Sequence, residues 1–286
     1  MRPEFLNRPF TCRENVQVRA FTEDHLWLSA LELAKQVHAA SKSHLSVLAQ
    51  HGGGPVAPRL KLEGALDDFA LDPGGLDTIN RPEKEWPLAR TQYQKLYLDA
   101  SNGSLSRNAV AKVSQSSYPG ETGKAEFVIR FDRETELTGY LKLKLWVEAD
   151  GADDMDLFVY VQKLDSHGNW LPSLILNHEH PGAQGWLRVS HRELDPKRST
   201  PAEPYHPHTR QQMLKPKEIV PVEIGIVPTG MRWHAGQQLR VVVGGHFMRE
   251  PTWFEKFKYE SRSPGTHIIH TGGQYDSHLL IPNIPL

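Results

Sequence analysis

The feature that most constrains this chain is an alternation of apolar and polar residues with a period of two, which begins near residue 90. Clear runs occupy residues 125–131, 141–147, 220–226 and 239–243, and shorter runs occupy 96–98, 157–161, 186–189, 267–270 and 279–281. This period places alternate side chains on opposite faces of a strand, so each run predicts a half-buried strand. No long helical pattern alternates with these runs, which disfavours a parallel α/β sheet. The sequence therefore predicts a mainly β fold, an antiparallel sandwich or barrel.

The first third of the chain has a different character. Residues 22–40 carry apolar side chains at helical spacing, and Thr22 can cap a helix there. Residues 59–85 are acidic and rich in turn residues, which is typical of a connector. We therefore expect an N-terminal extension over residues 1–85, with one short helix, and a β domain over residues 86–286. The helix is expected to cover an apolar face of that domain, because a lone helix of this length is marginal in water.

Composition excludes several classes of partner. The 286 residues include 33 Lys and Arg against 34 Asp and Glu, so the net charge is −1 and predicts no surface for nucleic acid or an anionic membrane. No apolar run is long enough to span a bilayer, and the first residues lack the core of a signal peptide. Cys12 is the single cysteine, which excludes an intrachain disulfide and favours a reducing compartment. The sequence predicts a cytoplasmic protein.

Two segments and one set of residue types resemble parts of a hydrolase site. Residues 51–54, His-Gly-Gly-Gly, have the form of an oxyanion-hole loop. Such a loop needs a nucleophile elbow, and residues 115–120 carry Gln115 where that motif requires glycine, so we interpret both segments as turns or loops. The residue types of a catalytic triad occur at Ser190, His191, Asp195 and Ser277. Residue types alone do not make a triad, and we expect no catalytic residue in this chain.

Metal sites are the next possibility. His178 and His180, and likewise His206 and His208, stand two residues apart, a spacing that suits zinc on a strand. Both pairs lie near prolines in expected loops, and packing within those loops is the better account. A group of aspartates before the strand at 157–161 could bind calcium or simply form turns; it comprises Asp150, Asp153, Asp154 and Asp156. We expect neither a metal nor a cofactor.

A binding surface is the remaining alternative. Trp146, Phe158 and Tyr160 lie opposite leucine or valine rows, so they could form an aromatic platform for a carbohydrate. The competing interpretation, which we prefer, is that both faces of each sheet are covered. Residues 194–218 form a long loop with five prolines. Such a loop is usually functional or packed over a sheet edge.

The β region resembles the C-terminal domain of X-prolyl dipeptidyl aminopeptidases and cocaine-esterase-type (CocE/NonD) serine hydrolases. The motifs that carry this resemblance are EWPLART at 85–91, DMDLFV at 154–159, GWLRVSHR at 185–192, PYHPH at 204–208, LKP at 214–216, VPVEI at 220–224, HTGG at 270–273 and YDSHLLIP at 275–282. The resemblance implies a jelly-roll β-sandwich similar to galactose-binding domains. It also implies that the histidine segments are recurrent features of a noncatalytic domain.

The same resemblance marks what this chain lacks. In the family, the catalytic serine, aspartate and histidine lie in a preceding α/β-hydrolase domain with a G-x-S-Y-x-G elbow. Residues 1–85 contain no such elbow, so no catalytic residue can be transferred. We therefore expect a noncatalytic module, either stand-alone or truncated, with a carbohydrate-binding module as the alternative. The expected partner is a hydrolase domain supplied in trans or a second copy of the chain.

Overall fold

The computed structural model describes residues 16–17, 82–83, 85–175, 178–248 and 263–285. The predicted helix at 22–40 and the His-Gly-Gly-Gly segment at 51–54 lie outside the described residues. So does most of the predicted connector, whose last part includes a short strand, β2 (Pro82–Glu83), that pairs with β1 (Val16–Gln17). In the described part of the chain, no helix is long and apolar enough to cross a membrane.

Strands dominate the described residues. After β2 they are β3 (Gln92–Asp99), β4 (Ser104–Ser106), β5 (Ser114–Pro119), β6 (Lys124–Arg130), β7 (Thr135–Asp150), β8 (Asp156–Leu164), β9 (Ser173–Ile175), β10 (His178–His180), β11 (Ala183–Arg188), β12 (Val220–Trp233), β13 (Gln238–Gly244), β14 (Thr266–Thr271) and β15 (His278–Ile284). A 3₁₀ turn, η3 (Val189–His191), follows β11 directly. Each run with the period of two overlaps a strand, so the predicted β class is confirmed.

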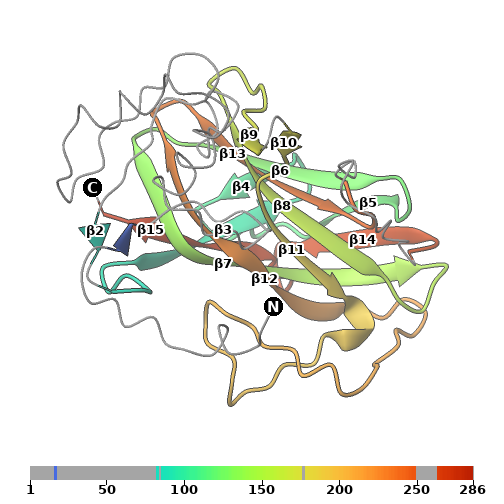
Figure 1. Ribbon diagram of the computed structural model, residues 1–286. Coiled ribbons are helices and arrows are strands. Elements are labelled where there is room, and N and C mark those ends of the chain that lie inside the picture. The colour runs from blue at the N-terminus through green and yellow to red at the C-terminus, as the bar shows by residue number, and fades with distance from the viewer. Residues whose placement is uncertain (1–15, 18–81, 84, 176–177, 249–262, 286) are drawn as a thin grey trace, which may run out of the picture.

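The strands form two layers (Figure 1). One layer has the order β11-β8-β13-β6. The other is built around the long strand β7, which pairs with β12 on one side and with β14 and β15 on the other; β15 continues to β3 and β4, and β14 to β5. One parallel residue pair, Ser104 with Val128, joins β4 to β6 and so links the layers.

The core lies between the inner faces of the two layers. Leu143 and Leu145 of β7 and Val159 and Val161 of β8 are fully buried members of one hydrophobic cluster. Burying a leucine or valine side chain contributes roughly 1.5–3 kcal/mol each. The period of two therefore predicts the buried face of β6 and β12, whereas every residue of β8 is buried. The fold is a β-sandwich, and the helical extension stays a prediction from the sequence.

Two predictions of loops were wrong. Residues 116–120 were expected to form a loop, but most of them belong to β5, where Ser117 pairs with Ile268 of β14. His178 and His180 were also placed in a loop, whereas they begin and end β10, which pairs with β9. In both cases backbone pairing with a neighbouring strand forms the element, and backbone pairing leaves little trace in side-chain hydrophobicity.

One of two facing glycines allows the layers to approach each other at the edge of the sandwich. A Cβ atom at Gly185 in β11 would overlap the carbonyl oxygen of Gly225 in β12. A Cβ atom at Gly225 would lie 3.5 Å from Pro204, which is ordinary contact. Close packing of β11 on β12 therefore depends on the glycine at 185 and not on the one at 225.

Replacing these glycines by alanine tests that asymmetry. We expect Gly185→Ala to lower the free energy of unfolding by about 1–3 kcal/mol, because overpacking forces the two strands apart. Gly225→Ala is the matched control, and its effect should stay within about 1 kcal/mol. Urea unfolding followed by circular dichroism measures both. Equal effects of the two substitutions would contradict this account.

His267 of β14 is fully buried, and among the described residues neither of its ring nitrogens has a hydrogen-bond partner. Its ring packs edge-on against the ring of Tyr118, with centroids 5.3 Å apart. Burial lowers the pKa of His267 from its ordinary value of 6.5 to about 4, and the carboxylate of Asp156 opposes part of that shift. The imidazole is therefore neutral in the folded protein at neutral pH.

This burial predicts a pH dependence of stability. The unfolded chain binds a proton at His267 near pH 6.5 and the folded chain near pH 4, so stability falls as the pH drops through this window. The loss should reach roughly 2–3 kcal/mol by pH 4. His267→Phe keeps an aromatic ring and should reduce the loss of stability between pH 7 and pH 4. His167→Phe, at an exposed histidine, should leave that loss unchanged. Thermal melts across this range decide the point, and an unaltered slope in His267→Phe would refute it.

Candidate functional site

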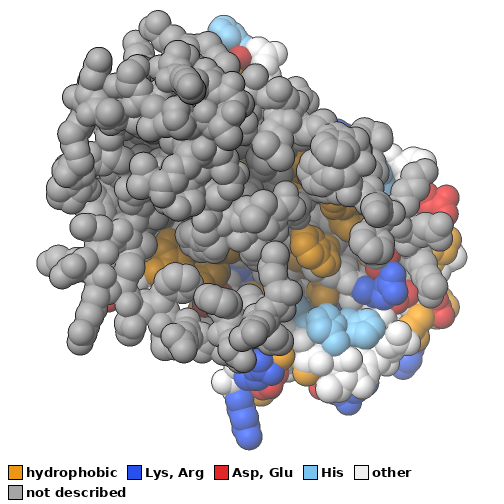
Figure 2. Space-filling view, viewed as in Figure 1, with side chains coloured by type: hydrophobic (Ala, Val, Ile, Leu, Met, Phe, Trp, Pro, Cys, Tyr) orange, Lys and Arg blue, Asp and Glu red, His pale blue; other side chains and the backbone are white. Residues whose placement is uncertain are grey.

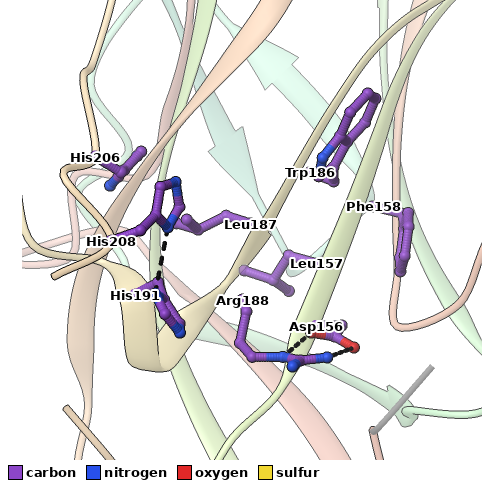
Figure 3. Close-up of a pocket in the computed structure, with 9 residues that line it drawn as sticks. All are labelled: Asp156, Leu157, Phe158, Trp186, Leu187, Arg188, His191, His206 and His208. Carbon is purple, nitrogen blue, oxygen red and sulfur yellow. Dashed lines mark hydrogen bonds and ion pairs between the residues drawn. The ribbon is translucent and has the colours of Figure 1, made fainter. Parts of the chain in front are cut away.

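A shallow hollow of about 270 Å³ lies where β11 ends at the edge of the sandwich. It is lined by residues of β8, β11, η3 and the long loop before β12, namely Asp156, Leu157, Phe158, Trp186, Leu187, Arg188, His191, His206 and His208. Figure 3 shows the three histidines on one side of β11, with Trp186 and Phe158 on the other. Histidine side chains also form a compact group beside hydrophobic ones on the face seen in Figure 2.

The pairing of β8 with β11 sets one wall of the hollow. Trp186 lies opposite Phe158 in the register, and Arg188 lies opposite Asp156. Phe158 is 5% exposed, whereas Trp186 is 58% exposed. Arg188 donates from Nε to Oδ1 of Asp156 at 2.7 Å and from Nη2 to Oδ2 at 3.0 Å. The buried carboxylate is thus neutralised by a two-point ion pair, and the indole is the open apolar group of this wall.

The loop before β12 is held against the sandwich by backbone hydrogen bonds. The N–H of Gln212 donates to the carbonyl of Ser190, and the N–H of Leu214 donates to that of Asp153, both at 2.7 Å. His206 contacts the carbonyl oxygens of Glu193 and Glu223, through Nδ1 at 3.0 Å and Nε2 at 2.9 Å. Both nitrogens of His206 therefore face backbone carbonyl oxygens, and the nitrogen that carries the proton donates to its carbonyl. The predicted long loop is confirmed, and it is packed over a sheet edge.

His191 and His208 meet across this loop. Their Nδ1 atoms are 3.3 Å apart, and their ring centroids are 5.2 Å apart. His208 has a φ of 52°, a left-handed backbone conformation that few residues other than glycine adopt. Desolvation lowers the pKa of His208, and the neighbouring His191 and His206 lower it further. At neutral pH this pair therefore favours uncharged imidazole at His208.

The three predicted platform residues do not share one surface. Trp146 lies on the outer face of β7, where its indole N–H donates to Asp276 at 2.9 Å. Phe158 and Tyr160 lie in β8 of the other layer and are 5% and 1% exposed. The carbohydrate platform therefore stays a hypothesis, and these three side chains do not provide one common face for it. The exposed aromatic residue at the hollow is Trp186 instead.

The residues with triad chemistry do not form a hydrogen-bonded set in the described structure. Ser190 is fully buried, and the hydroxyl of Ser277 donates to the carbonyl of His270 at 2.7 Å. Asp195 accepts from the backbone of Lys197. Of the aspartates considered for calcium, Asp154 accepts from backbone N–H groups and Asp156 pairs with Arg188. Among the described residues, no group of three or more His, Cys, Asp or Glu side chains could hold a metal ion.

Sequence reasoning missed two features of the hollow. The pattern at 186–189 predicts a strand but not the exposure of Trp186, which follows from the position of β11 at the edge of its layer. The meeting of His191 with His208 bridges seventeen positions of irregular chain. Four prolines mark that segment as a loop, but no local pattern indicates which of its side chains approach η3.

Comparisons with known proteins agree with this architecture. Residues 43–280 match the model of the X-Pro dipeptidyl-peptidase C-terminal non-catalytic domain. Two crystal structures of a CocE/NonD family hydrolase from Staphylococcus aureus are similar over 73% of this chain, with 39% and 38% identity and a TM-score of 0.69 in each case. An aminopeptidase from a marine sediment Thaumarchaeota archaeon shares the fold at 15% identity and a TM-score of 0.53, over 72% of this chain and 39% of its own. A search of curated proteins gave no match.

The extent of the match defines what is shared. This chain spans 39% and 40% of the lengths of the two staphylococcal structures, so the likeness concerns one part of those hydrolases. The family model covers more than half of the chain and describes a non-catalytic domain. The two-layer β architecture and the residue motifs from 85 onward agree with that description. The chain belongs to the family of X-Pro dipeptidyl-peptidase C-terminal non-catalytic domains found in CocE/NonD-type hydrolases.

Proposed function

We propose that this chain works as a noncatalytic partner of a CocE/NonD-type α/β-hydrolase domain supplied in trans. The carrying observation is its match to the X-Pro dipeptidyl-peptidase C-terminal non-catalytic domain, supported by 39% identity to part of a CocE/NonD family hydrolase. The chemistry, dipeptidyl-peptidase or ester hydrolysis, would belong to the hydrolase domain. The role of this chain would be to stabilise that domain and to shape its surroundings.

The described residues support a noncatalytic role on chemical grounds. Nucleophilic catalysis needs a hydroxyl or thiol bonded to a base, with donors placed for the oxyanion. Ser190 is buried, and the hydroxyl of Ser277 is engaged with a backbone carbonyl. His191 approaches His208 and Gln211 instead of a hydroxyl. A partner that brings its own nucleophile fits this arrangement.

The hollow around Trp186 is the contact surface that we favour. Four large hydrophobic side chains are exposed in the described part of the chain, and two of them, Trp186 and Met213, belong to β11 and the loop after it. Tryptophan is enriched at the energetic centres of protein interfaces, where it is buried by the partner. Self-association as a two-fold dimer is the second candidate, because the same exposed indole could meet its copy. A cytoplasmic location is part of this proposal and rests on the single cysteine.

Activity of the purified chain is the first test. We expect no hydrolysis of X-Pro dipeptide anilides or of simple aryl esters above buffer, because a nucleophile with its base is lacking among the described residues. The staphylococcal CocE/NonD family hydrolase is assayed in parallel on both substrates. Turnover by the full chain that disappears in Ser117→Ala would contradict the proposal, since Ser117 stands at the nucleophile position of the rejected elbow.

A chimera tests the partnership itself. In the staphylococcal hydrolase, the matching C-terminal part is replaced by residues 86–286 of this chain, and we expect a soluble, folded enzyme. Trp186→Ala should then lower the unfolding free energy of the chimera by about 2 kcal/mol, the cost at which an interface residue counts as a hot spot. The same substitution in the isolated chain should change its stability by less than about 0.5 kcal/mol, because the indole is exposed there.

Val113→Ala is the matched control, because Val113 is 54% exposed and lies outside the hollow. It should leave both proteins unchanged. Equal effects of Trp186→Ala in the chimera and in the isolated chain would exclude Trp186 from the contact.

A further inference from the structure

The two facing imidazoles of the hollow have the spacing of ligands to one metal ion. The Nδ1 atoms of His191 and His208 are 3.3 Å apart. Two nitrogens that each lie about 2.05 Å from a tetrahedral zinc ion are separated by about 3.3 Å. In the absence of an ion, the same two atoms are close enough to share one long hydrogen bond between the rings. The spacing is thus compatible with coordination of one ion by both nitrogens, and that ion would take the place of the hydrogen bond.

We propose that His191 and His208 together bind one divalent transition-metal ion of the zinc type through their Nδ1 atoms, with water completing the coordination. Imidazole nitrogen is a preferred ligand of such ions. This inference is independent of the proposed hydrolase partner, since it concerns side chains within this chain alone.

The backbone supports the assignment. His208 is held at a φ of 52°, which costs free energy for a residue with a Cβ atom. Strain of this kind persists where the surrounding structure imposes it and concentrates at ligand sites. Here the loop is fixed at Gln212, whose N–H donates to Ser190 and whose carbonyl accepts from the Arg192 guanidinium. The loop thus presents the ring of His208 to η3. An exposed contact between two rings would contribute little to offset the strain at His208.

The surroundings limit the site to two protein ligands. His206 is 5.9 Å from His208 by ring centroids, but both of its nitrogens are engaged with carbonyl oxygens. The carboxylate of Asp156 is held by Arg188, and that of Glu193 by Arg210. The ion would therefore keep several waters and bind in the micromolar range or weaker, well below a closed structural site.

Isothermal titration of the full chain with ZnCl₂ at pH 7.5 tests the proposal. We expect one saturable event that weakens at least tenfold in His208→Asn, a substitution chosen because asparagine tolerates the left-handed backbone. His167→Asn removes an exposed histidine outside the hollow and should bind as the wild type does. Because the chain has fifteen histidines, the difference between these variants assigns the site.

A second readout identifies the coordinating atoms. In ring-nitrogen NMR spectra, zinc should shift the Nδ1 resonances of both His191 and His208. Thermal melts without zinc establish whether His208→Asn is folded. If that variant is unfolded, His191→Gln replaces it in the comparison with the wild type. The absence of wild-type binding at millimolar zinc would overturn the proposal. So would equal affinities of the wild type and the folded variant, or shifts confined to other histidines.

Discussion

The burial of the inner face of β7 against that of β8 is the constraint on which the rest of the molecule depends. Leu143 and Leu145 on one strand, and Val159 on the other, have no exposed surface. A slip of one residue in β7 would turn Lys142 and Lys144 into this core, and burying unpaired ammonium groups costs far more than a hydrophobic face gains. The register of the neighbouring strands follows from which face of β7 and of β8 is buried. This includes the pairing of β11 with β8, which directs Trp186 outward.

The two outer faces of the sandwich differ as a result. On β7 the outward side chains are satisfied within the chain, since Lys142 pairs with Glu223 at 2.8 Å, Lys144 with Asp276 at 2.6 Å and Glu148 with His270 at 2.9 Å. This face has few polar groups left to offer a partner. At the edge of the other layer an indole is exposed beside three imidazoles. Asymmetry of this kind favours the hollow over the face of β7 as the functional surface.

The sequence predicts the strands whose apolar and polar side chains alternate. It does not predict the elements and contacts that depend on backbone pairing or on loop geometry. Residues 141–147 show their buried face directly, as do residues 239–243. Ser114–Pro119 carries no apolar alternation and becomes β5 through pairing with β14. The contact of His191 with His208 needs a left-handed backbone at His208, which no propensity at a histidine predicts. The family motifs identify the domain type because they are spread over the whole β domain. The site within that domain depends on single contacts, such as that of His191 with His208, which no motif predicts.

The exposed indole and the facing imidazoles line one hollow, and this proximity has a thermodynamic consequence. A domain that buries Trp186 would also approach His191 and His208, because all three residues line the same 270 Å³ depression. If an ion on the imidazoles changes the affinity for that domain, docking must change the affinity for the ion by the same factor. The sign depends on what the partner brings: a carboxylate facing the histidines could replace a coordinating water and strengthen both events, whereas an arginine there would repel the ion and weaken both. The charge of the opposing surface thus decides whether metal binding and docking reinforce or exclude each other.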